Sequence, residues 1–213
     1  MPLIGDHAPE FHAMTTQGKI DFPADYKGSW VVLFSHPADF TPVCTTEFIA
    51  LSRMNETFES LNTKLIGLSI DSLHSHLGWI KSIEALNFNN EGKVKIPFPI
   101  IADISMNVAR KYGMLQTVAN TQTVRAVFII DPEGMIRTIL YYPMSTGRNI
   151  PEIIRILQSL QLNDKTHYST PANWQPGDDV VMGAPLTIEE AQERLESSDN
   201  TIKPLDWYLT MKK

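Results

Sequence analysis

SHPADFTPVCTTE, residues 35–47, joins an apolar run to a helical pattern. Before it, Trp30-Val31-Val32-Leu33-Phe34-Ser35 is rich in β-branched and aromatic residues, which predicts a buried strand. After it, apolar residues recur every three or four positions through residues 44–61, which predicts a helix with one apolar face. The segment therefore connects a strand to the start of a helix, and we expect Cys44 in the first turn of that helix.

The chain on the C-terminal side continues this alternation of strand and helix patterns. In chain order the pattern predicts a strand at 64–70, a helix at 72–86, a loop at 87–99, a short helix at 105–112, a strand at 125–130, a turn at 131–134, a strand at 135–141 and a helix at 150–162. This order favours an α/β sandwich in which helices flank a mixed central sheet.

The composition changes at Thr170, where prolines, glycines and asparagines become frequent. One polar helix is expected near residues 189–197, and the rest of this region is expected to be extended. We therefore expect a main domain over residues 1–169 and a small C-terminal arm over residues 170–213. The arm has too few apolar residues for a core of its own, so it should pack on the main domain or on a partner subunit.

The bulk composition narrows the function classes. The chain has 213 residues and a formal net charge of -6, with no Lys/Arg cluster of the kind that binds nucleic acid. It has no apolar run long enough to span a membrane, and its N-terminus does not resemble a signal peptide. The single cysteine excludes an internal disulfide. A reducing compartment, the cytoplasm, is the expected location.

Cys44 has two interpretations from the residues alone: a buried inert thiol or a reactive one. At a helix N-terminus, unpaired backbone N–H groups and the helix dipole favour an anion such as a thiolate. Thr41, three residues earlier, is expected either to cap the helix or to turn its hydroxyl toward the sulfur. Pro37 and Pro42 restrict the backbone, and Pro37 is expected to shield the sulfur from water.

Pro37-x-x-x-Thr41-x-x-Cys44 resembles the active-site motif of the peroxiredoxins. The wider segment 35–47 is similar to the one-cysteine subgroup, which includes mammalian peroxiredoxin six and archaeal thioredoxin peroxidases. The similarity extends over nearly the whole chain, including residues 5–11, residues 69–72 and the segment RAVFIIDP at residues 125–132. The resemblance implies a thioredoxin-like fold and a thiol peroxidase that needs no cofactor or metal.

The resemblance also implies roles for the site residues. Cys44 would attack a peroxide and become a sulfenic acid, while Arg125 would stabilise the thiolate and the charge of the leaving oxygen. Thr41 and Pro37 would complete the catalytic set. The backbone amides of Val43 and Cys44 would orient the peroxide. Two further residues, Arg148 and Glu47, match less specific positions near the substrate, where Glu47 would position either arginine.

His36 is typical of the one-cysteine subgroup, and two interpretations remain open. It contacts Cys44 or its oxidised forms, or it satisfies a backbone group at the strand end. His74 and His76 do not share a helix face, so no metal site is expected there.

The resemblance further implies hydrogen peroxide or an alkyl hydroperoxide as substrate and, without a second cysteine, an external thiol as reductant. It implies a homodimer assembled into a homodecamer, with the C-terminal arm as the dimerisation element. Two alternatives remain. The first is a non-catalytic redox sensor or chaperone on the same fold, and the second is a cysteine hydrolase that uses Cys44 and His36.

Overall fold

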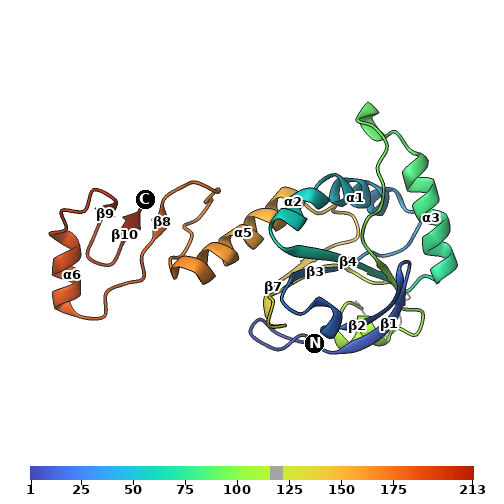
Figure 1. The fold of residues 1–213 in the computed structure, drawn as a ribbon, viewed down its shortest axis with the longest axis horizontal. Coiled ribbons are helices and arrows are strands. Elements are labelled where there is room, and N and C mark those ends of the chain that lie inside the picture. The colour runs from blue at the N-terminus through green and yellow to red at the C-terminus, as the bar shows by residue number, and fades with distance from the viewer. Residues whose placement is uncertain (116–121) are drawn as a thin grey trace. The chain divides into compact units, whose positions relative to one another are not determined.

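A computed structural model describes residues 1–115 and 122–213 of the chain (Figure 1). The chain forms two compact units, Met1–Ile150 and Pro151–Lys213. The first unit contains every residue expected at the peroxidase site, and each unit is described below by itself. The predicted boundary between residues 169 and 170 stays a prediction.

The first unit is built on a mixed sheet whose strands run in the order β2-β1-β5-β4-β3-β6-β7. The strands are β1 (Phe11–Thr15), β2 (Gly18–Phe22), β3 (Trp30–Ser35), β4 (Thr63–Ser69), β5 (Ile100–Ala102), β6 (Arg125–Ile130) and β7 (Ile136–Tyr142). β3, β4 and β5 are parallel, whereas β6 and β7 form an antiparallel hairpin beside β3. The expected α/β class with a mixed, thioredoxin-like sheet is confirmed.

The two faces of the sheet carry separate apolar layers because strand side chains alternate in direction. On one face Leu33 belongs to a buried cluster that includes Val108 and Tyr112. On the other face Phe34 packs edge-on against Phe48, with ring centroids 5.5 Å apart. All six residues of β3 are buried, as expected for a central strand that is covered on both faces.

Helices of this unit follow the strands as the sequence predicted, with one difference. They are α1 (Pro42–Arg53), α2 (Asn55–Ser60), α3 (Leu73–Ala85) and α4 (Asn107–Lys111), with short 3₁₀ turns at Ala24–Tyr26 and Phe88–Asn90. The single helix expected over residues 44–61 is wrong. Met54 (φ -94°, ψ 4°) leaves helical geometry and separates α1 from α2, although the apolar periodicity runs through the break.

Three strands of the sheet were not predicted from the sequence. β1 and β2 form a short hairpin that turns at Gly18 (φ 107°), a backbone conformation that glycine adopts without steric cost. β5 has only three residues and follows directly on the loop at residues 87–99. Short strands with mixed polarity carry little periodicity, so only their pairing with longer neighbours identifies them.

The second unit, Pro151–Lys213, contains most of α5 (Ile150–Thr166), then α6 (Ile188–Leu195) and a small sheet of order β8-β10-β9. Its strands are β8 (Val180–Val181), β9 (Ile202–Pro204) and β10 (Thr210–Lys212). The polar helix was predicted, whereas this sheet was not. Among the described helices, none combines the length and apolar character that a membrane crossing requires.

Candidate active site

Cys44 occupies the first turn of α1, where the chain leaves the central strand β3. Thr41 is the residue before the helix, with extended backbone (φ -107°, ψ 145°), and Pro42 is the first helical residue. Proline suits this position because its missing N–H would have no partner in the helix. The amides of Val43 and Cys44 likewise have no carbonyl one turn earlier. The Cys44 side chain is fully buried at the positive end of the helix dipole.

The Thr41 hydroxyl takes neither of the two orientations expected from the sequence. It donates to the carbonyl oxygen of Ala38 at 2.8 Å, and it makes no capping bond to the helix. This acceptor lies in the same turn, three residues earlier, so the hydroxyl makes a local hydrogen bond. The hydroxyl therefore fixes the shape of the turn, and its oxygen lone pairs remain able to accept a hydrogen bond.

Arg125 reaches the sulfur from the first residue of β6. Its Nη1 lies 3.2 Å from the Sγ of Cys44 and 2.8 Å from Oε2 of Glu47. The other edge of the guanidinium, Nε and Nη2, donates to the carbonyl oxygen of Met144 at 3.0 and 2.9 Å. The planar group is thus held on both edges, with one nitrogen directed at the sulfur.

Glu47 lies one turn beyond Cys44 on α1 and binds both arginines of the site. Its Oε2 accepts from Arg125 at 2.8 Å and from Nη2 of Arg148 at 2.6 Å. Its Oε1 accepts from the backbone N–H and the Nε of Arg148 at 2.8 and 3.0 Å. Arg148 also donates to the carbonyl oxygens of Ser35 and Ala126, so it ties α1 to the two central strands.

These contacts define a charge balance around the sulfur. Arg125, Arg148 and Glu47 are all buried, and they contribute two positive charges and one negative charge. An ionised Cys44 makes this group of four neutral. Buried charges are costly unless they are paired, and Arg125 brings a positive charge to 3.2 Å from the sulfur.

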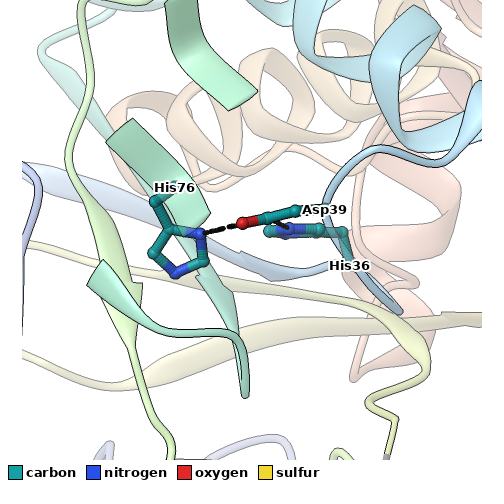
Figure 2. A group of neighbouring side chains, drawn as sticks. All are labelled: His36, Asp39 and His76. Carbon is teal, nitrogen blue, oxygen red and sulfur yellow. Dashed lines mark hydrogen bonds and ion pairs between the residues drawn. The ribbon is translucent and has the colours of Figure 1, made fainter. Parts of the chain in front are cut away.

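A second buried group forms around Asp39, in the turn between β3 and α1 (Figure 2). Nε2 of His36 is 2.8 Å from Oδ1 of Asp39, and Nδ1 of His76, from α3, is 2.8 Å from Oδ2 of Asp39. Burial lowers the pKa of His36 below its ordinary value. Burial alone would raise the pKa of Asp39, but hydrogen bonds from the two histidines hold it well below its usual range.

His36, Asp39 and His76 are also the residues best able to hold a metal ion within residues 1–115 and 122–213. Each offers one ligand atom, and these atoms lie within 4.8 Å of one another. Every one of these atoms already takes part in a short hydrogen bond within the group. The three side chains are thus already joined by hydrogen bonds.

Four of the predicted site residues lie together at the Cys44 sulfur, and others lie in the turn before α1 and at its start. Cys44, Arg125, Glu47 and Arg148 come together at the sulfur, although β6 and α1 are far apart in sequence. Pro37 is buried in the turn and Val43 is half-buried in the first turn of α1. The roles assigned to these residues stay predictions.

Sequence reasoning missed Asp39 and His76. Asp39 stands inside the quoted segment, between His36 and Thr41, so its position was visible. As a metal ligand, His76 was considered together with His74 along one helix. Its side-chain hydrogen-bond partner is Asp39, which comes from the turn after β3 and not from its own helix.

Comparison with known families matches segments of both units. Residues 4–139 match the model of the AhpC/TSA family. Residues 159–198 match the model of the C-terminal domain of 1-Cys peroxiredoxin. Together the two matches cover both units of the chain.

Individual proteins agree over their full length. A protein of Methanosarcina mazei named peroxiredoxin is 58% identical over 215 residues, covering 100% of this chain and 98% of the relative. A peroxiredoxin of Aquifex aeolicus is 46% identical over 224 residues, covering 100% of this chain and 97% of the relative. Among solved structures, yeast mitochondrial 1-Cys peroxiredoxin aligns with a TM-score of 0.87 at 41% identity over 100% of both chains. A cysteine-to-serine mutant of peroxiredoxin 6 from Arenicola marina gives 0.85 at 34% identity over 100% of this chain and 98% of the other.

Proposed function

The chain belongs to the peroxiredoxins of the AhpC/TSA family, which are thiol-dependent peroxidases, and on that premise we propose that Cys44 reduces hydrogen peroxide and organic hydroperoxides through a sulfenic acid. The observation that carries the proposal is the 3.2 Å distance between Nη1 of Arg125 and the Cys44 sulfur. A fixed cation at this distance favours the reactive thiolate. It can also stabilise the negative charge that develops on the oxygen of a bound peroxide.

The first step breaks the O–O bond of the peroxide. The Cys44 thiolate attacks one oxygen, an S–O bond forms, and the second oxygen leaves with the bonding electrons as hydroxide or alkoxide. Cysteine is oxidised to sulfenic acid, the peroxide is reduced, and a proton from solvent converts the leaving group to water or alcohol.

The surrounding groups suit the charge that develops in this step. Arg125 donates toward the leaving oxygen, and the unpaired amides of Val43 and Cys44 add two further donors at the helix start. The Thr41 hydroxyl uses its O–H to donate a hydrogen bond to the carbonyl oxygen of Ala38. Its oxygen can therefore accept a hydrogen bond from the O–H of a peroxide. Donors and an acceptor thus surround the O–O bond.

Reduction of the sulfenic acid requires an external thiol because the chain has one cysteine. The donor thiol condenses with the sulfenic acid, releasing water and forming a mixed disulfide, and a second thiol then restores Cys44. The similar yeast mitochondrial protein is described as resolving its thiol through glutathione and thioredoxin systems. We infer the same class of donor here, in a reducing compartment such as the cytoplasm.

Rapid mixing of the reduced protein with hydrogen peroxide tests the proposal. We expect a second-order reaction far faster than that of a free thiol, followed by mass spectrometry that finds one added oxygen on Cys44. Cys44→Ser is the control and should consume no peroxide. A rate equal to that of a free thiol would contradict the proposal and favour the alternative of a non-catalytic sensor or chaperone.

We propose that the second unit mediates assembly with another copy of this chain, as a homodimer built into a homodecamer. Large apolar side chains are exposed on it, with Leu186 91% and Ile188 81% accessible, and Trp207 half-exposed nearby in the same hollow. Exposed apolar groups gathered in this way mark interaction surfaces.

Sedimentation measures the assembly directly. The reduced protein should sediment as an even-numbered oligomer, and the double variant Leu186→Ser with Ile188→Ser should sediment as a smaller species. Met14→Ser, which removes an exposed apolar side chain from the first unit, is the matched control and should leave the assembly intact. A monomeric wild-type protein would contradict the proposed assembly.

A further inference from the structure

His36, Asp39 and His76 form a buried hydrogen-bonded unit that the peroxide chemistry does not use (Figure 2). Both histidine side chains are fully buried, and the Asp39 side chain is 1% exposed. His36 follows β3, Asp39 lies in the turn, and His76 comes from α3. The unit therefore joins the turn that leads to Cys44 to a different element of the fold.

The protons of this unit can be counted from its contacts. The Nε2 of His76 lies 3.2 Å from the carbonyl oxygen of Ile101, which can only accept. Its Nδ1 lies 2.8 Å from the Asp39 carboxylate, which is ionised because the histidine hydrogen bonds hold its pKa low. Both nitrogens of His76 face acceptors, so both carry protons and the ring is an imidazolium.

His36 completes the count as a neutral ring. Its Nε2 faces Oδ1 of Asp39 and therefore carries a proton, whereas its Nδ1 is buried without a hydrogen-bond partner. The rings of Phe48 and Trp79 lie against it, each with a centroid 4.9 Å away. A second cation in this apolar surrounding would be costly beside His76, so the Nδ1 of His36 is a bare lone pair.

We propose that Asp39 and His76 are positioning residues of the peroxidase site. The Asp39 carboxylate, balanced by the His76 imidazolium, fixes the tautomer of His36 and holds the turn between β3 and α1 in place. This inference rests on the proposed function, because its consequence is the placement of Cys44.

The turn needs such an anchor because its backbone is strained. Phe40 has a φ of 54°, in the left-handed region that a bulky residue rarely adopts. Asp39, directly before it, is held twice: through its side chain by the two histidines, and through its backbone N–H by Oδ2 of Asp71 at 3.0 Å. Thr41, directly after it, is held by its bond to Ala38. The strain is thus retained by fixed residues on both sides.

This anchor affects the reaction because it sets the distance between the Cys44 sulfur and Arg125. The turn runs without interruption into the first turn of α1, which carries Cys44. A shift of about 1 Å in a reacting group can lower a rate about 100-fold. Loosening Asp39 therefore moves the sulfur relative to Arg125, whose own position is set from β6 and by Met144.

Nitrogen NMR of the histidine rings tests the proton count without any turnover. The chain has six histidines, so each can be assigned by substitution. In the reduced full-length protein at neutral pH we expect two protonated nitrogens in His76, and one protonated and one bare nitrogen in His36. A neutral His76 ring, or a proton on Nδ1 of His36, would overturn the inference.

Kinetics of Cys44 oxidation test the positioning role. Asp39→Asn keeps the size of the side chain but removes the negative charge and replaces one of the two acceptor oxygens by an NH2 donor, so we expect a 10- to 100-fold slower reaction and an altered His36 tautomer. His76→Asn keeps an N–H near Asp39 without the charge and should lose less. His74→Asn, at an exposed position two residues away on α3, is the matched control and should react within twofold of wild type.

Three outcomes separate the alternatives. An Asp39→Asn protein with wild-type rate and wild-type His36 tautomer would overturn the inference. Zn²⁺ that shifts the His36 and His76 signals of the wild-type protein would overturn it too, because the group would then be a metal site. A wild-type protein with the expected proton pattern but no peroxide consumption would contradict the proposed function instead, since the NMR result does not depend on it.

Discussion

Two buried charged groups are formed by residues of the turn after β3 and of α1, and they differ in what they contact. The arginine group, Glu47, Arg125 and Arg148, touches the sulfur through Arg125 at 3.2 Å. In the histidine group, the side chains of His36, Asp39 and His76 make their described hydrogen bonds with one another and with the carbonyl oxygen of Ile101, and none of these bonds involves the sulfur. The comparison teaches that burial and charge alone do not identify the chemical partner of a nucleophile. Direct contact with the reacting atom does.

The two groups also differ in charge. The arginine group has one cation more than it has anions, which suits an ionised sulfur beside it. The histidine group has one imidazolium and one carboxylate and is neutral by itself. We therefore expect changes to the arginine group to affect the stabilisation of negative charge at the sulfur and the peroxide. Changes to the histidine group are expected to affect the position of the turn before Cys44 and the pH dependence of stability.

Glu47→Gln is the most disruptive change expected. It leaves the Arg125 and Arg148 guanidinium groups buried without their common carboxylate, and removing one partner of a buried ion pair costs about 3–5 kcal/mol. Urea unfolding of the reduced protein measures the loss. Glu152→Gln, which breaks a partly exposed pair with Arg155, is the control and should cost about 1 kcal/mol or less. Equal losses for both variants would contradict the comparison.

Arg125→Lys should slow Cys44 oxidation about 100- to 1000-fold, the usual effect of removing one donor to a developing oxyanion. Lysine keeps the charge but cannot bind Met144 and Glu47 while it also reaches the sulfur. Rapid mixing with hydrogen peroxide measures the rate. Arg110→Lys, on an exposed part of α4, should react like wild type. A wild-type rate for Arg125→Lys would show that charge alone is sufficient.

His36 is expected to make stability depend on pH, with the smallest effect of the three. The folded protein keeps His36 neutral because burial lowers its pKa, whereas the unfolded chain protonates it below about pH 6.5. Below pH 6.5 the unfolded state therefore binds more protons than the folded state. The contribution of His36 to the free energy of unfolding then decreases as the pH falls, by up to about 1.4 kcal/mol per pH unit. Urea unfolding between pH 7 and pH 5 should find a weaker pH dependence for His36→Gln. An unchanged dependence would place the titrating group elsewhere.

Much of the first unit was predictable because its signals are local. β3, β4 and β6 are largely apolar runs, and α3 repeats apolar residues at helical spacing, as does α5 of the second unit. The break between α1 and α2 at Met54 and the three-residue strand β5 were not predictable in this way. The pattern of β5 is too short to identify a strand, and the apolar periodicity continues through the break at Met54. Contacts with residues distant in the sequence determine both features.

The sequence by itself placed the one cysteine after Thr41 and Pro42 at a strand-to-helix junction, and family resemblance marked it as the candidate nucleophile. The same resemblance also marked Arg125, Glu47 and Arg148 as candidates. Only the tertiary structure decided that Glu47 binds both arginines at once, that the Thr41 hydroxyl turns to Ala38, and that His76 meets Asp39. The physical reason is that helix and strand patterns arise from neighbouring residues. Hydrogen bonds between buried side chains depend on which elements the packed sheet brings together.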